Sequence, residues 1–182
     1  MSRWPDGPPE EAYGRVTDPE RFAALHTASH QVLDDLEQHY DVVRETFTEF
    51  DRHSPEPATG IRLVPSDPAA ASLTLVLNAF PGVNIRAGSR EWTHLPYCGC
   101  DACDETAEEL LQSLHSHVDA VTRGSIGERL VHEDGAWWHE SWMRDAAGYG
   151  SGSRVRLDAD QLAEQRSSLP DGELTWAAWP TR

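Results

Sequence analysis

Apolar side chains recur at helical spacing in two stretches of the chain, and these stretches predict its two main helices. Between Thr17 and Tyr40 the apolar stripe with a period of 3.6 residues consists of Phe22, Leu25, Val32, Leu33, Leu36 and Tyr40. Thr17 and Glu20 have the spacing of a capping box, which predicts that the first helix begins at Thr17. The second helix is expected from about Thr106 to Arg123, because Gly124 is a typical helix end. Its apolar side consists of Leu110, Leu111, Leu114, Val118 and Val121.

Strand patterns occupy the segment between these helices. Alternating positions predict strands over residues 42–50 and 61–64. Residues 73–80 are apolar on both alternating sets, which predicts a central strand covered on two sides. Pro81 and Gly82 then turn the chain into a strand over residues 83–87.

The segment after the second helix contains a predicted hairpin with strands at 129–132 and 136–143. The dipeptide Asp134-Gly135 fits the positive backbone angles of a two-residue type I′ turn, which pairs Glu133 with Ala136 and His132 with Trp137. Further along, a glycine- and serine-rich loop at 148–153 precedes a short strand at 154–157. A short helix capped by Asp158 or Asp160 and ending near Ser167 follows, and residues 173–179 close the chain.

These strands cluster around the two helices instead of alternating with them, which favours an α+β fold. We predict an antiparallel sheet of about five to seven strands packed with two main helices and a short C-terminal helix. A length of 182 residues favours one domain spanning 1–182. Residues 1–16 form an irregular proline-rich arm, which Trp4 and Tyr13 pin onto the globular body at 17–182.

The charge balance narrows the set of partners. The chain has 31 acidic and 15 basic residues and a net charge of −16, and it contains no lysine. Such an anionic protein repels polyphosphate and anionic lipid, so we expect no nucleic-acid partner and no membrane. The N-terminal residues resemble neither a signal peptide nor a transit peptide, which predicts a cytoplasmic protein. Its partner, a protein or a small molecule, is not identified by the sequence.

Three cysteines lie within six positions, and they are the clearest chemical signal in the chain. Zinc prefers thiolate and imidazole ligands in a tetrahedral arrangement. We predict that Cys98, Cys100 and Cys103 bind zinc and that His94 is the fourth ligand, with Asp101, Asp104 or solvent as alternatives. Four protein ligands would make the zinc structural, because a catalytic zinc keeps one position open.

Two other interpretations of the cysteines are open. The three side chains are small and partly buried without a metal, or Cys100 and Cys103 serve as a redox pair. Acidic residues beside them argue against the redox role, because negative charge raises a thiol pKa. The same acidic residues, Asp101, Asp104 and Glu105, favour a bound cation.

Three weaker patterns offer other sites. His26 and His30 are one helical turn apart, as two metal-binding imidazoles would be. In the predicted hairpin one face carries His132, Trp137 and His139, and the other carries Trp138, Glu140 and Trp142. These residues either fill a hairpin buried on both sides or line an aromatic pocket. A possible anion site consists of Arg62, Arg86, Arg154 and Arg156.

Two functional hypotheses follow from these patterns. The first is a binding or regulatory domain that a zinc ion at the cysteines stabilises. The second is an enzyme, hydrolase-like, that acts on a small molecule with zinc or with a pocket of His132, His139 and Glu140.

Two stretches resemble a known family. They are Trp4 to Tyr13 leading into Thr17 to Phe22, and the run from Cys98 to Glu105. Together they resemble an actinobacterial family of proteins of unknown function, and the likeness covers nearly the whole chain. This resemblance implies no activity, substrate or catalytic residue.

Overall fold

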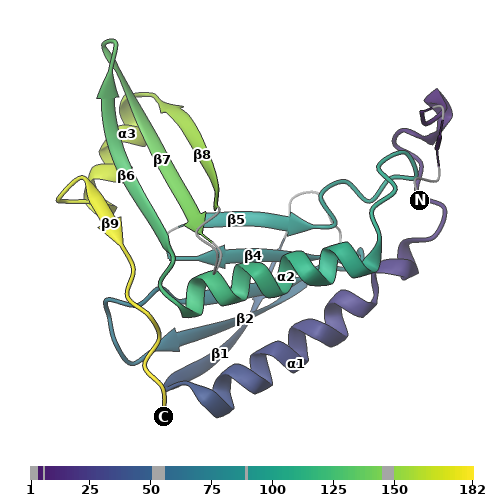
Figure 1. The fold of residues 1–182 in the computed structure, drawn as a ribbon, viewed down its shortest axis with the longest axis horizontal. Helices are drawn as coiled ribbons and strands as arrows, with labels where there is room; N and C mark the ends of the chain where they lie inside the picture. The colour runs from purple at the N-terminus through teal and green to yellow at the C-terminus, as the bar shows by residue number, and fades with distance from the viewer. Residues whose placement is uncertain (1–3, 6, 51–55, 89, 145–149) are drawn as a thin grey trace.

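A five-stranded antiparallel sheet forms the centre of the protein (Figure 1). The computed structural model describes residues 4–5, 7–50, 56–88, 90–144 and 150–182. The strands follow one another in chain order as β1 (Val42–Glu49), β2 (Ala58–Pro65), β3 (Leu73–Leu77), β4 (Val83–Ala87) and β5 (Arg90–Leu95). All five residues of β3 are buried, which confirms the predicted central strand.

Two helices, α1 (Ala24–His39) and α2 (Ala107–Thr122), lie side by side over one face of this sheet (Figure 1). The pairing register aligns Ile61, Leu75 and Ile85 across three strands, and all three side chains are buried in one core with Leu33 and Leu114 of the helices. A capping box of Thr106 and Glu109 fixes the start of α2. The predicted apolar stripes therefore do face the sheet.

The predicted start of the first helix is wrong. The chain makes a 3₁₀ turn over Pro19–Phe22, and α1 begins only at Ala24. Thr17 does not cap this turn, because its backbone N–H and its hydroxyl both donate to the carboxylate of Asp101. A partner distant in the sequence thus replaces the local capping box.

A second antiparallel sheet is built around the predicted hairpin. Its strand order is β8-β7-β6-β9, with bounds β6 (Ile126–Glu133), β7 (Ala136–Arg144), β8 (Gly150–Leu157) and β9 (Glu173–Thr175). Asp134 and Gly135 both have positive φ, and Glu133 pairs with Ala136 and His132 with Trp137, as predicted. The third helix, α3 (Ala159–Ser168), begins with a capping box at Asp158 and contacts β8.

The α+β class is confirmed, but the strands form two sheets where one was expected. The long helix α2 separates β5 from β6 along the chain, and the strands after it form the sheet that rises away from the helices in Figure 1. β5 was not predicted, because its sequence lacks the apolar alternation of its neighbours. Of the predicted loop at 148–153, residues 150–153 belong to β8, and residues 148–149 lie outside the described part of the chain. None of the helices in the described residues is long and apolar enough to cross a membrane.

The last residues of the chain run past the end of α1 and the connection between β2 and β3, where Thr181 bridges Tyr40 and Ala177 bridges Ala70. The Trp179 indole N–H donates to the Ala71 carbonyl at 2.8 Å, and its ring meets Tyr40 edge-on with centroids 5.5 Å apart. This segment also passes directly over Gly124 at the end of α2. A Cβ at Gly124 would lie 2.5 Å from the backbone carbon of Ala177, so the close approach requires glycine.

Substitution of two glycines should separate the cost of this contact from the cost of the backbone angle. Both Gly124 and Gly135 have positive φ, but a Cβ at Gly135 meets nothing within 4 Å. We expect Gly135→Ala to lower the free energy of unfolding by about 1 kcal/mol, from backbone strain alone. Gly124→Ala should lower it by about 3 kcal/mol, because the C-terminal segment must also move. Urea unfolding measures both, and equal losses would contradict the proposed packing.

Candidate metal centre

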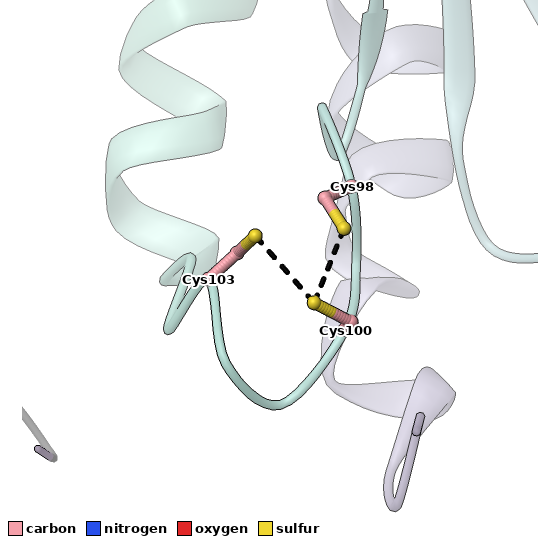
Figure 2. A group of neighbouring side chains, drawn as sticks. All are labelled: Cys98, Cys100 and Cys103. Carbon is pink, nitrogen blue, oxygen red and sulfur yellow. Dashed lines mark hydrogen bonds between the residues drawn. The ribbon is translucent and has the colours of Figure 1, made fainter. Parts of the chain in front are cut away.

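The three cysteine sulfurs come together in the loop between β5 and α2 (Figure 2). Sγ of Cys100 lies 3.2 Å from Sγ of Cys98 and 3.5 Å from Sγ of Cys103, and all three sulfurs lie within 4.8 Å of one another. None of them is in a disulfide. In a tetrahedral zinc site with Zn–S bonds of about 2.3 Å, the sulfurs would be about 3.8 Å apart. The observed group therefore needs only small adjustments to surround an ion.

The cluster has a protein side and a solvent side. Cys100 is buried, with 4% of its surface exposed, whereas Cys98 and Cys103 are exposed. An ion bound by the three sulfurs would therefore be held from the protein side by Cys100 and remain reachable by solvent between the other two.

The thiols have different proton affinities. The pKa of Cys100 is lowered to about 6, chiefly because the Cys98 thiol donates to its sulfur and the backbone N–H of Cys103 is close to it. The pKa of Cys103 is raised to about 12, because its thiol interacts with the sulfurs of Cys98 and Cys100 and loses solvation. A metal ion would have to displace the Cys103 proton, since thiolate is the form that binds a metal.

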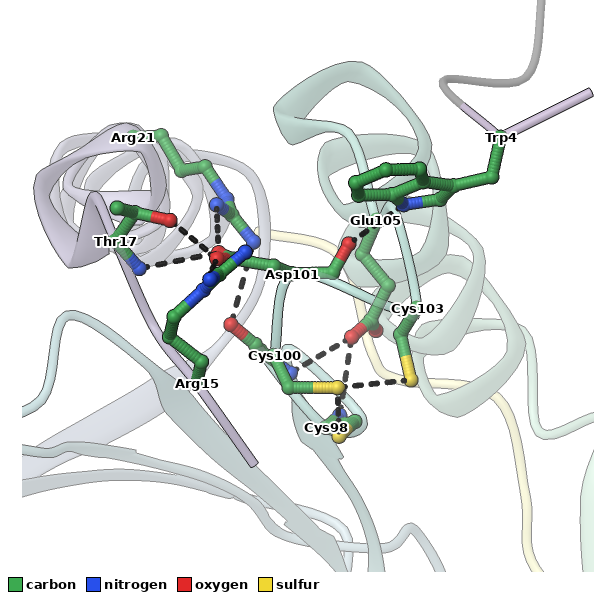
Figure 3. Close-up of polar contacts among 10 residues, drawn as sticks. Trp4, Arg15, Thr17, Arg21, Cys98, Cys100, Asp101, Cys103 and Glu105 are labelled. Carbon is green, nitrogen blue, oxygen red and sulfur yellow. Dashed lines mark hydrogen bonds and ion pairs between the residues drawn. The ribbon is translucent and has the colours of Figure 1, made fainter. Parts of the chain in front are cut away.

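One carboxylate, that of Glu105, holds the backbone of the cysteine loop (Figure 3). It accepts backbone N–H groups from Tyr97 at 2.7 Å, Cys98 at 3.0 Å and Gly99 at 2.9 Å. Glu105 directly precedes the capping box that starts α2, so the helix and the loop are fixed to each other. The sequence marked Glu105 only as a nearby negative charge, and it did not predict that Glu105 anchors the loop backbone.

A second carboxylate, that of Asp101, ties the loop to the N-terminal arm (Figure 3). It is fully buried and accepts the backbone N–H of Thr17 at 3.0 Å, the Thr17 hydroxyl, and Nε of Arg15 at 2.9 Å. Nη1 of Arg21 lies 3.6 Å from Oδ1 of Asp101. The Thr17 hydroxyl, then its N–H, then the Arg15 guanidinium hold the Asp101 pKa far below its usual range. Asp101 is therefore charged and matched by donors from the arm and from the residues that directly follow it.

The backbone of the arm also contacts the cysteine loop. Asp101 N–H donates to the Arg15 carbonyl at 2.8 Å, and Ala102 N–H donates to the Ala12 carbonyl at 3.2 Å. The Trp4 indole N–H donates to the Asp101 carbonyl at 3.1 Å, so Trp4 pins the arm as predicted. Tyr13 does not share this role, because 61% of its surface is exposed.

The structure does not bring the proposed fourth ligands into the group of sulfurs. His94 is exposed on β5, and its Nε2 lies 3.0 Å from the Tyr97 carbonyl oxygen. The Asp101 carboxylate is taken by Thr17 and Arg15. Within the described residues, the group of close metal-ligating atoms contains the three cysteines and neither His94, Asp101 nor Asp104.

Neither of the other histidine pairs forms a metal-ligating group of three or more side chains within the described residues. Nε2 of His26 lies 3.0 Å from the Gly82 carbonyl oxygen, and no metal-ligating group of described residues includes His30. In the second sheet, His139 pairs with Glu128 at 3.0 Å, and both side chains are buried. Glu140 lies on the other face, so the pocket of His132, His139 and Glu140 does not form.

The proposed arginine cluster is divided between the two sheets. Arg86 pairs with Glu49 across the five-stranded sheet, whereas Arg62 contacts the Ser72 hydroxyl there at 3.2 Å. Arg154 and Arg156 lie on β8 of the other sheet, where Arg154 pairs with Glu133. The four side chains therefore do not form one anion site.

Removal of the Asp101 charge should release the arm. In Asp101→Asn, Arg15 and Arg21 lose their anionic partner, and a buried amide replaces a matched carboxylate. Because the chain has no lysine, trypsin cuts it only after arginine, and we expect faster cleavage after Arg15. Mass spectrometry of timed digests measures this rate.

The matched control is Asp171→Asn, which removes the same charge from an exposed turn. Its cleavage after Arg15 should match that of the unmodified protein. If both variants were cleaved after Arg15 at the same rate, Asp101 would not be the residue that holds the arm.

The comparisons with known proteins agree with the predicted resemblance but identify no activity. No curated protein and no solved structure matches the chain. The actinobacterial source remains a prediction. A family model described as a family of unknown function, DUF6226, matches residues 1–182, and the chain therefore belongs to this family.

Proposed function

We propose that Cys98, Cys100 and Cys103 bind a zinc ion and that this ion stabilises a binding or regulatory protein. The observation that carries the proposal is the approach of three free sulfurs to within 4.8 Å of one another. Three thiols this close without a metal would compete for shared protons, in agreement with the lowered pKa of Cys100 and the raised pKa of Cys103. An ion would replace that competition with three favourable bonds.

The ligand set favours zinc over harder cations. Thiolate sulfur is a soft donor, which magnesium and calcium do not select, and zinc accepts tetrahedral thiolate sites without a redox change. The loop needs little further ordering to bind such an ion, because Glu105 and Asp101 fix its backbone on two sides. The net charge of −16 also favours uptake of a cation.

The same contacts favour a binding role over catalysis. A zinc hydrolase needs a general base beside the metal-bound water, but the Glu105 carboxylate is occupied by three backbone N–H groups and that of Asp101 by the arm. The redox alternative at Cys100 and Cys103 has less support, because the raised pKa of Cys103 disfavours its thiolate. Three neighbouring cysteines without a disulfide are typical of a reducing compartment, which agrees with a cytoplasmic protein.

Zinc analysis of the purified protein tests this proposal. We expect stoichiometric zinc in the unmodified protein and little in Cys100→Ser, which loses the sulfur that contacts both others. Zinc at about 1,000 times its Kd should add about 4 kcal/mol to the free energy of unfolding, and a chelator should remove this gain. Elemental analysis and thermal unfolding measure the two effects.

The control variant is Glu108→Gln, an exposed position on the first turn of α2 that lies outside the sulfur group. It should retain zinc and the chelator-sensitive stability. The proposal fails if the unmodified protein contains no zinc and its unfolding is unaffected by added zinc and by chelator.

A further inference from the structure

A three-sulfur site leaves a tetrahedral ion with one position to fill. Zinc in proteins takes four ligands, and the described residues place three ligand atoms in the group. Two of the candidates that the sequence offered have other partners: His94 contacts the Tyr97 carbonyl, and Asp101 accepts from Arg15 and Thr17. The fourth position on the ion is therefore open to a donor from outside the chain.

The position is accessible. Cys98 and Cys103 are exposed, so a ligand can approach the ion between them without displacing the core around Cys100. Two exposed aromatic side chains flank the loop. The Phe80 ring packs against Gly99, where an added Cβ would lie 3.0 Å from it, and the Tyr97 hydroxyl lies 3.1 Å from the Ser113 hydroxyl on α2.

Charge decides which donor fits best. Three thiolates outweigh the charge of a divalent ion, so the metal centre is itself anionic in a chain of net charge −16. An external thiol would have to lose its proton, at a pKa of about 8.5, and bring a further negative charge. Imidazole is mostly neutral above a pH of about 6.5 and brings none. Three cysteines with one histidine are also an established ligand set for zinc.

We propose that the cysteine centre takes an imidazole from outside the chain as its exchangeable fourth ligand. This inference rests on the proposed metal site and names the ligand class that the site binds. The imidazole belongs either to a small molecule or to a histidine of a partner protein. In the second case the exposed Phe80 and Tyr97 side chains offer apolar contact to the residues beside that histidine.

The test uses the full chain loaded with cobalt(II), a spectroscopic substitute for zinc, and free imidazole as the probe. We expect imidazole to shift the visible cobalt bands saturably, with a Kd of about 1 mM or tighter, at neutral pH. His94→Ala should respond in the same way. N-acetylcysteine should bind more weakly than imidazole under the same conditions.

Two further measurements identify the source of the ligand. The peptide acetyl-Leu-His-Leu-amide should bind more tightly than free imidazole if the natural donor is a protein histidine, and Tyr97→Ala should remove that advantage. Equal affinities of peptide and imidazole in the unmodified protein would instead assign the position to a small imidazole compound.

Three results would overturn the proposal. One is cobalt bound with thiolate charge-transfer bands whose spectrum imidazole leaves unchanged. Another is a response to imidazole only in His94→Ala, which would make His94 the fourth ligand. The third is tighter binding of N-acetylcysteine than of imidazole. A protein that takes up no cobalt and no zinc would refute the metal site itself, so the two failures are distinguishable.

Discussion

Two carboxylates, those of Asp101 and Glu105, hold the cysteine loop in place, and the rest of the site depends on them. Glu105 gathers the backbone N–H groups of residues 97–99 at the start of α2. Asp101 is buried among donors from the N-terminal arm. Burial of a charged group is costly unless it is paired, so this arrangement persists only while arm and loop stay together. This double attachment fixes the backbone that carries the three sulfurs.

The arm and the proposed metal should therefore stabilise each other. The Asp101 N–H donates to the Arg15 carbonyl and the Ala102 N–H donates to the Ala12 carbonyl, and both loop residues lie between Cys100 and Cys103. An ion that orders the sulfurs would also order these two donors, and by linkage a docked arm would raise the affinity for the ion. The remote regions, including the second sheet and its buried pair of Glu128 and His139, contribute no ligand to this site within the described chain.

The sequence predicted most of the fold but only part of the site. Periodicity placed both long helices and β3, and turn chemistry placed the pairing of His132 with Trp137, because these signals are local. The sequence predicted the three cysteines as a group, but it did not predict the partner of Thr17. Local capping rules made Thr17 the cap of the first helix, whereas in the structure Thr17 donates to Asp101. That contact joins residues 84 positions apart, a separation that no local pattern encodes. His94 and Tyr97 are only three positions apart, but the sequence does not give the backbone path of the loop between them, so it could not show that His94 contacts Tyr97 instead of joining the sulfurs.

Amide hydrogen exchange of the arm with and without zinc tests the central claim most directly. The N–H groups of Thr17 and Ala102 join the arm region to the cysteine loop, whereas those of the hairpin turn at Asp134 and Gly135 belong to the second sheet. Zinc should slow exchange at Thr17 and Ala102 and leave the hairpin turn unchanged. Zinc binding without any change in the exchange of the arm would contradict the coupling of arm, loop and metal.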